Sequence, residues 1–311
     1  YCTDSNNCWA VGDSGVIIKW NGTSWNNVTS PTNRGLNSVY CTANNNCWAV
    51  GDPGNGEDER PFILYWNNTT ETWTKRNSNL NIDRTLTSVY CTSDNNCWAV
   101  GEQGNGADER PLILWWDGSS WTKRNSNLNE NQTLNSVYCT ANNNCWAVGD
   151  PGNGEDERPF ILYWNNTTET WTKRNSNLNI DRTLTSVYCT SDNNCWAVGE
   201  QGNGADERPL ILWWDGSSWT RRNSSLDINQ LLNSVHCVDA DNCWTVGNNS
   251  NGELIIRWNG ATWSRVGPYA GIPDRDLYSV FMVSATDGWA VGNAGTIIHW
   301  NGTSWSLWQQ A

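Results

Sequence analysis

The chain alternates short apolar runs with polar, glycine-rich gaps, and it repeats one order of these segments. A unit starts with a run such as LNSVYC, crosses a polar gap to CWAVG, and reaches a second apolar run such as FILYW after a glycine-rich loop. A tight turn and a final run such as SWTKRN complete the unit. Runs rich in Val, Ile, Tyr and Trp between Gly, Asn and Asp predict strands joined by hairpins, and no segment has useful helical periodicity.

The unit occurs seven times, and the units start near residues 1, 36, 86, 134, 184, 232 and 277. Residues 36–122 also recur unchanged as residues 134–220, which indicates a duplicated block of two units. A period of about 40 to 50 residues is typical of propellers and solenoids. Four short antiparallel strands in each of seven units predict an all-β, seven-bladed β-propeller in which residues 1–311 form a single domain.

Tryptophan usage supports packed blades. The chain contains 24 tryptophans, and all but Trp115, Trp213 and Trp308 fall on three recurring positions: the CWAVG segment, the end of the third strand and the fourth strand. A residue that every repeat requires is better explained by packing than by ligand contact, because large aromatic rings dominate the burial of apolar surface.

The twelve cysteines form six pairs, each with five intervening residues between the first and second strands. In the seventh unit both cysteine positions change together, to Met282 and Gly288. Joint presence and joint absence predict a disulfide in each of the first six hairpins, between Cys2 and Cys8, Cys41 and Cys47, Cys91 and Cys97, Cys139 and Cys145, Cys189 and Cys195, and Cys237 and Cys243. A zinc site is disfavoured by the spacing and by the presence of only two histidines. Six disulfides predict an oxidising compartment, and hence secretion or the cell surface.

The start of the chain affects what can be expected of its targeting. Tyr1-Cys2 corresponds to Tyr40-Cys41 of the next unit, so the first strand starts close to its end. The sequence therefore has the features of a processed or excerpted part of a longer chain. Any targeting or anchoring segment is expected outside it, and membrane association is expected only through such segments.

Four long loops, between the second and third strands of units 2 to 5, concentrate acidic residues. They read GDPGNGEDERP and GEQGNGADERP, each twice. Three interpretations stay open: a solvated belt of ion pairs with nearby Lys and Arg, a calcium site, or a ligand or glycan pocket repeated on each blade. The candidate calcium ligands are Asp52, Glu57, Asp150 and Glu155. The candidate ligand-binding residues are Asp58, Glu59, Arg60, Asp108, Glu109, Arg110, Asp156, Glu157, Arg158, Asp206, Glu207 and Arg208.

The segment DGWAVGNAGTIIHWNGTSW (287–305) resembles the repeat of the photosystem II assembly and stability factor family of seven-bladed propellers. It also resembles, more loosely, the Asp-box repeats of sialidase-type propellers. The Asp-box has Ser or Thr two residues before its Asp and Gly two residues after it, whereas WNGTSW and WWDGSSW keep only the turn and the final Trp. The resemblance therefore implies the propeller fold and leaves the activity open.

Enzymatic function is disfavoured. Carboxylates are repeated from blade to blade, whereas a propeller enzyme needs one asymmetric group of residues around its channel, and the arginine cluster and tyrosine nucleophile of sialidases cannot be assembled. A net charge of −13 and a pI near 4.5 disfavour nucleic acid as a partner. Sequons predict a glycoprotein, with candidate acceptors Asn21, Asn67, Asn131, Asn165, Asn223, Asn248 and Asn301.

These patterns together predict a non-enzymatic, secreted or cell-surface propeller that acts as a structural and interaction module. Its expected partners are other surface proteins or copies of itself, within a larger surface assembly. The alternative is a lectin-like, multivalent glycan-binding propeller, and a sialidase-like glycoside hydrolase is the least favoured interpretation. No cofactor is predicted beyond the candidate calcium ion.

Overall fold

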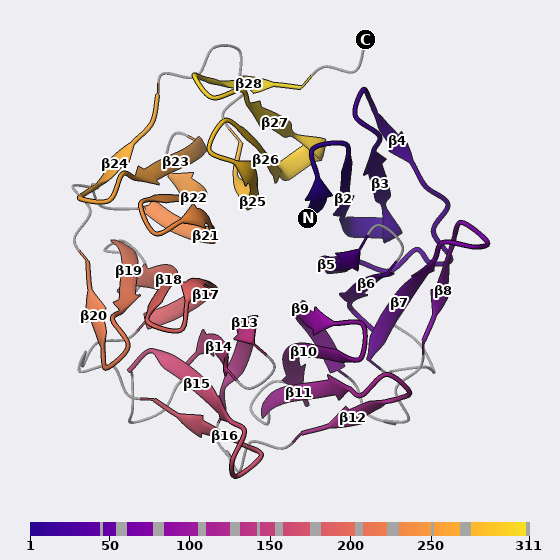
Figure 1. Cartoon of the computed structure of the whole chain (residues 1–311), viewed down its shortest axis with the longest axis horizontal. Helices are drawn as coiled ribbons and strands as arrows, with labels where there is room; N and C mark the ends of the chain where they lie inside the picture. Colours follow the sequence, from indigo (N-terminus) through magenta and orange to yellow (C-terminus); the bar gives the residue numbers. More distant parts are fainter. Residues whose placement is uncertain are drawn as a thin grey trace. The chain divides into compact units, whose positions relative to one another are not determined.

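The computed structural model describes residues 1–43, 46–53, 61–76, 84–104, 110–124, 131–141, 144–152, 158–174, 182–202, 208–222, 230–249, 252–267 and 275–308. Within these residues the strands form seven four-stranded sheets, and in each sheet the strands are hydrogen-bonded in their sequence order (Figure 1). Neighbouring strands pair antiparallel, as do β9 with β10, β10 with β11, and β11 with β12. The predicted all-β, seven-bladed propeller with four antiparallel strands per blade is confirmed.

The blades follow one another along the chain. Blade 1 contains β1 (Cys2–Asp4), β2 (Asn7–Val11), β3 (Ile17–Trp20) and β4 (Trp25–Asn27), with a 3-10 turn η1 (Asp13–Gly15) between β2 and β3. Blade 2 contains β5 (Leu36–Ala43), β6 (Asn46–Gly51), β7 (Phe62–Asn67) and β8 (Thr72–Lys75). Blade 3 contains β9 (Arg84–Ser93), β10 (Asn96–Gln103), β11 (Arg110–Trp116) and β12 (Trp121–Lys123). Blade 4 contains β13 (Thr133–Ala141), β14 (Asn144–Asp150), β15 (Phe160–Asn165) and β16 (Thr170–Lys173).

The last three blades repeat this pattern. Blade 5 contains β17 (Arg182–Ser191), β18 (Asn194–Gln201), β19 (Arg208–Trp214) and β20 (Trp219–Arg221). Blade 6 contains β21 (Gln230–Asp239), β22 (Asn242–Asn249), β23 (Gly252–Trp258) and β24 (Trp263–Arg265). Blade 7 contains β25 (Leu277–Ser284), β26 (Asp287–Gly292), β27 (Ile297–Trp300) and β28 (Trp305–Leu307), with a 3-10 turn η4 (Asn293–Gly295) before β27. Among the described residues, no helix is both long enough and apolar enough to cross a membrane.

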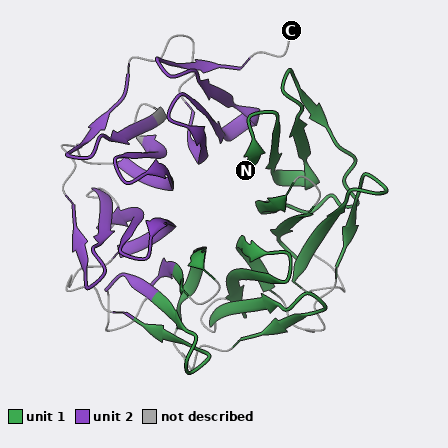
Figure 2. Cartoon of the chain, viewed as in Figure 1, with its two compact units in different colours: residues 1–147, 152–154, 162–173 green, residues 148–151, 155–161, 174–311 purple. Residues whose placement is uncertain are grey.

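The chain divides into two compact units, coloured separately in Figure 2. Unit 1 comprises residues 1–147, 152–154 and 162–173, and unit 2 comprises residues 148–151, 155–161 and 174–311. Within unit 1 the first strands of consecutive blades pack side by side, β5 against β1 and β9, and β9 against β13. Within unit 2, β21 packs in the same way between β17 and β25. Within each unit, first strands thus form one of the contacts between neighbouring blades.

Serine and valine of the first strand link neighbouring blades. The Ser88 hydroxyl accepts a hydrogen bond from the Val137 amide at 3.3 Å, and the Ser186 hydroxyl accepts one from the Val235 amide at 3.2 Å. The Thr87 hydroxyl donates to the carbonyl oxygen of Leu134 at 2.7 Å. These bonds satisfy backbone groups that a first strand would otherwise bury unpaired, which explains why the repeat keeps SV at this place.

Tryptophans build the interior between blades, as their recurrence predicts. Trp48 of blade 2 lies 4.9 Å from Trp116 and 5.2 Å from Trp121 of blade 3, ring centre to ring centre, and the second contact is edge-to-face. Trp244 of blade 6 makes the same pair of contacts with Trp300 and Trp305 of blade 7. Burial of each such side chain removes about 150 to 250 Å² of surface from water, and edge-to-face or tilted ring pairs add a further stabilising interaction. These contacts therefore dominate the blade interfaces.

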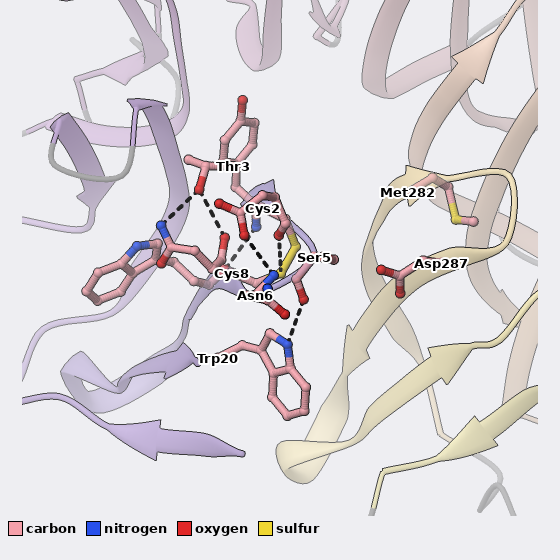
Figure 3. The surroundings of a disulfide bond; sticks show 12 residues. Cys2, Thr3, Ser5, Asn6, Cys8, Trp20, Met282 and Asp287 are labelled. Carbon is pink, nitrogen blue, oxygen red and sulfur yellow. Dashed lines mark hydrogen bonds between the residues drawn. A yellow bond between two sulfur atoms is a disulfide. The ribbon is translucent and has the colours of Figure 1, made fainter. Parts of the chain in front are cut away.

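All six predicted disulfides are present, and the described chain has no free cysteine. Each joins residues that face each other directly in the first hairpin, with Cα atoms 3.9 to 4.0 Å apart, as Cys2 and Cys8 do. Figure 3 shows the Cys2–Cys8 bridge and the polar gap beside it. There the Trp20 indole donates to the carbonyl oxygen of Ser5 at 3.0 Å, so the third-strand tryptophan also anchors the gap that the bridge closes.

Candidate functional site: a pocket between blades 2 and 3

A polar link joins the second and third strands on the outer part of several blades. In blade 2, the Tyr65 hydroxyl donates to Oδ1 of Asn46 at 2.6 Å. In blades 3 and 5 the donors are the indoles of Trp115 and Trp213, which bond to Asn96 and Asn194 at 2.6 and 2.7 Å. This link explains two of the tryptophans that fall outside the three recurring positions: their rings take the place that a tyrosine has in blade 2.

An arginine stacks on this aromatic residue. Arg76 follows β8 and lies 5.3 Å above the Tyr65 ring, measured from its guanidinium carbon to the ring centre. Arg124 lies 4.3 Å above Trp115, and Arg222 lies 4.2 Å above Trp213. The backbone fixes each arginine here, because its amide continues the pairing of the fourth strand with the third; the Arg76 amide, for example, donates to Ile63 at 2.8 Å. Guanidinium–ring attraction then orients the side chain.

Between blades 2 and 3 these groups border a pocket of about 470 Å³. Trp48, Tyr65 and Trp116 form its aromatic wall, and Trp48 lies 4.8 Å from the Tyr65 ring. The remaining lining residues are Asn46, Arg76, Asp94, Asn95, Gly118 and Ser119. The pocket therefore offers ring surface, a guanidinium, a carboxylate and side-chain amides within one volume, which suits a small polar ligand or a protein side chain with both apolar and charged parts.

Two hydrogen bonds hold Asp94 in this pocket. Its carboxylate accepts from the Thr42 hydroxyl of blade 2, and its carbonyl oxygen accepts from the Trp116 indole at 3.1 Å. Asp94 belongs to the polar gap of the blade 3 hairpin, and the disulfide between Cys91 and Cys97 closes that gap. The bridge and the indole thus fix the backbone of Asp94, and the Thr42 hydroxyl holds its carboxylate in the pocket that Arg76 also lines.

The corresponding place between blades 3 and 4 is arranged differently. There Arg124 lies 4.0 Å from a carboxylate oxygen of Glu169, on the longer turn between β15 and β16. Blade 3 has the shorter turn Asp117–Ser120 instead, and in the described part of the chain no carboxylate lies within ion-pair distance of Arg76. Turn length therefore decides whether the stacked arginine is paired or available to a partner.

Most predicted ligand-binding residues cannot be placed. Arg110 and Arg208 begin β11 and β19 with exposed side chains, and Arg158 is half-buried just before β15. The other members of the predicted set lie outside the described residues: Asp58, Glu59, Arg60, Asp108, Glu109, Asp156, Glu157, Asp206 and Glu207. The ligand pocket built on these loops stays a prediction.

The candidate calcium ligands are partly described. A carboxylate oxygen of Asp52 accepts from the Asn37 amide at 3.0 Å, and one of Asp150 accepts from the Thr183 hydroxyl at 3.1 Å. Glu57 and Glu155 lie outside the described residues. Within the described ranges, no three His, Cys, Asp or Glu side chains are grouped so that they could hold a metal ion. The residues in view give no support to the calcium site, which stays a prediction.

Sequon asparagines have a structural role in the turns between third and fourth strands. Asn21 Oδ1 accepts from the amides of Thr23 and Ser24 at 3.0 and 2.9 Å. The same cap is made by Asn67, Asn165 and Asn301, and in other blades by Asp117, Asp215 and Asn259. An Asx turn of this kind explains the recurrence without a glycan. Of the remaining candidates, Asn131 is exposed, Asn248 lies in β22 and Asn223 lies outside the described residues, so glycosylation stays a prediction.

Sequence reasoning missed the pocket between blades 2 and 3. Its components were visible as repeated residues: Asn or Asp directly before the second-strand cysteine, an aromatic residue before the third-strand tryptophan, and Arg after the fourth strand. The sequence did not show that these residues come together. The pocket is formed by two blades, and no pattern within one repeat shows which side chains of neighbouring blades meet.

Comparison with known proteins gives structural matches only, since no family model and no curated protein matches the chain. A solved structure described as "YCF48 bound to D1 peptide" matches with a TM-score of 0.68 and 16% sequence identity, over 96% of this chain and 89% of that one. "YCF48 from Cyanidioschyzon merolae" matches with the same TM-score and identity, over 97% of this chain and 94% of that one. The likeness is one of fold. It confirms the resemblance to photosystem II assembly factors at that level.

Proposed function

We propose that this chain is a non-enzymatic interaction module that binds other proteins through its blade interfaces. The proposal rests on the pocket between blades 2 and 3. Arg76, which has no carboxylate within ion-pair distance among the described residues, lines this pocket together with aromatic rings and the carboxylate of Asp94, which a hydrogen bond holds in place. Arginine, tyrosine and tryptophan are the residue types enriched at protein interfaces. One of the matched YCF48 structures is described as bound to a peptide, which is consistent with this use of the fold.

Repetition favours binding over catalysis. The polar link and the stacked arginine recur in blades 2, 3 and 5, so the chain presents related surface groups several times. Several weak contacts to one partner, or to an array of copies, combine into strong overall binding, whereas one catalytic site gains nothing from duplicated blades. A structural role in a larger surface assembly fits the same arrangement.

A displayed library of random peptides tests the proposal. We expect enrichment of binders by the intact chain, with retention reduced at least tenfold by Arg76→Ala and by Asp94→Ala. Arg265→Ala, on the fourth strand of blade 6, which contributes no residue to this pocket, is the matched control and should bind as the parent chain does. Enriched peptides that bind all three variants equally would place the partner surface elsewhere. Turnover of a glycoside by the purified chain, abolished by one substitution, would contradict the non-enzymatic proposal.

A lectin-like role is the second candidate, and the pocket's aromatic wall favours it. Sugar rings stack on half-buried aromatic faces such as that of Trp116, and side-chain amides and carboxylates such as Asn95 and Asp94 bond to hydroxyls. A glycan array then separates the two candidates. Binding that rises steeply with glycan density and is lost in Asp94→Ala supports the lectin role, and no binding at any density supports a protein partner.

We propose secretion or display at the cell surface on the strength of the six disulfides. Two labelling experiments test this. The chain is isolated from its cells and denatured without a reductant, and we expect a thiol reagent to label no cysteine. Intact cells are treated with a membrane-impermeant amine reagent, and we expect it to label the chain. Full thiol labelling would contradict the location.

A further inference from the structure

Two arginines are buried at the start of first strands. Arg84 begins β9 with 2% of its surface exposed, and Arg182 begins β17 with 1% exposed. They occupy the same position in the two copies of the duplicated block, and they lie in different units of the structure. The same feature therefore occurs in two separate settings.

Each guanidinium is only partly satisfied. Nη1 of Arg182 donates to the side-chain oxygen of Gln201, while its Nε and Nη2 are buried without an acceptor. Nη1 of Arg84 donates in the same way to Gln103, and its Nε is buried without an acceptor. Nε and Nη2 form the edge of a guanidinium that binds two oxygens of a carboxylate or phosphate in parallel. In Arg182, the two nitrogens that lack an acceptor are therefore the pair that can bind such an anion.

Among the described residues, the charges near these arginines are positive. The Lys123 ammonium donates to the same oxygen of Gln103 at 2.6 Å, so two cations share one neutral acceptor. The pKa of Lys123 is lowered by burial and by the nearby Arg84 and Arg110 charges. Burial, with Arg221 as a second cause, lowers the pKa of Arg182 to about 10. Of the carboxylates in the described ranges, none is in contact with Arg84 or Arg182.

The fold does not require a charge at this position. Blades 4 and 6 have Gln132 and Gln230 there, which are 1% and 6% exposed. An isolated charge is far costlier to bury than a neutral amide of similar length. Since glutamine occupies the equivalent positions of blades 4 and 6, the buried arginines of blades 3 and 5 indicate a role for the charge.

We propose that the chain binds two small oxyanions of the phosphate or sulfate class, one at Arg84 with Lys123 and one at Arg182 with Arg221. Nε and Nη2 of Arg182 bind two oxygens of one ion, Nε of Arg84 binds an oxygen of the other, and the neighbouring cation contributes the remaining charge. Lys123 is only half-buried and Arg110 is exposed, which gives the ion a positively charged approach from solvent. This site is independent of the pocket between blades 2 and 3 and of the partner proposed for it.

Isothermal titration calorimetry with inorganic phosphate and with sulfate, at constant ionic strength set by sodium chloride, tests this. We expect saturable binding of about two ions per chain, one ion after either Arg84→Gln or Arg182→Gln, and none after both. Glutamine is the residue that the chain uses at positions 132 and 230, so these variants are expected to fold; tryptophan fluorescence of the native state checks that they do. Millimolar phosphate should raise the melting temperature of the parent chain and not that of the double variant.

Arg275→Gln is the matched control. Arg275 lies at the corresponding position of blade 7, outside the buried interior, and donates to the carbonyl oxygen of Ala294 at 3.0 Å. This variant should keep both ions. The proposal is overturned if the parent chain shows no saturable binding, if the double variant binds as many ions as the parent, or if the double variant is the more stable protein with and without phosphate. The last result would mean that no bound ion compensates the buried charges of the two arginines.

Discussion

The first hairpins of blades 3 and 7 fill the same space with different chemistry. In blade 3 the bridge between Cys91 and Cys97 packs into a core that also contains Trp48 and Trp121. In blade 7 the facing residues are Met282 and Gly288, and Met282 packs with Trp300 and Trp305. A Cβ atom added to Gly288 would lie 2.4 Å from the Met282 sulfur, so the methionine covers the glycine and takes the volume that two sulfurs occupy elsewhere.

This difference shows that side chains must fill the space between the two strands in every blade, whereas the covalent bond is not required in every blade. Met282 is 3% exposed, as deeply buried as the cysteines of the other blades, and the register of β25 with β26 matches that of the bridged hairpins. The joint loss of both cysteines is therefore a packing replacement. The two residues fit each other, because a cysteine at 288 would displace the end of the Met282 side chain and a lone glycine would leave a cavity.

The largest expected effect separates volume from covalency in blade 3. Cys91→Ala with Cys97→Ala removes both, and we expect a loss of about 3 to 5 kcal/mol in the free energy of unfolding. Cys91→Met with Cys97→Gly transplants the blade 7 solution and should lose only the cross-link, about 2 kcal/mol. Urea unfolding followed by tryptophan fluorescence measures both. Equal losses in the two double variants would show that methionine over glycine does not fill this space.

The reverse exchange in blade 7 is expected to have a smaller effect. Met282→Cys with Gly288→Cys places two cysteines on directly facing residues, as in the other six hairpins, and should form a seventh bridge. We expect a gain of up to about 2 kcal/mol under oxidising conditions. The same variant under a reductant is its own control and should be less stable than the parent treated identically. Failure to form the bridge, read from free-thiol counting, would mean that the backbone of this hairpin differs from the others.

The repeat made the scaffold predictable from sequence. Seven like units predict seven blades because each unit supplies its own strands and turns, and paired cysteines predict their bridges because both partners lie in one hairpin. Arg84 was not recognised, since nothing in IDRTLTS distinguishes an inward arginine from one in a solvated linker. Likewise, the role of Trp115 became visible only with its bond to Asn96. The strands, turns and disulfides of one repeat could be predicted, whereas side-chain bonds, burial and contacts with a neighbouring blade could not.

A pH-dependent effect is expected for the residue that contacts the blade 7 hairpin from blade 6. His236 lies between the rings of Tyr188 and Phe281, 4.4 and 4.2 Å away, and its Nδ1 accepts from the Met282 amide at 3.3 Å. Burial lowers the pKa of His236 from about 6.5 to about 3. The native state therefore keeps this ring neutral, while the unfolded chain binds a proton below about pH 6.5. The stability contributed by His236 is complete above that pH and is lost as the pH falls toward 3.

His236→Tyr tests this linkage, because tyrosine occupies the equivalent position of blade 5, at Tyr188. Losing the acceptor for the Met282 amide should shift stability by an amount that does not depend on pH. The titration of His236 adds a part that does depend on pH. Between pH 6.5 and 4, the difference in unfolding free energy between the two proteins should change by at most about 1.4 kcal/mol per pH unit, because the parent loses more stability as the pH falls. Urea unfolding at half-unit steps measures it, and groups common to both proteins cancel in the difference. Parallel pH curves would show that His236 is protonated in the folded chain, and hence that the hairpin of blade 7 does not exclude water from it.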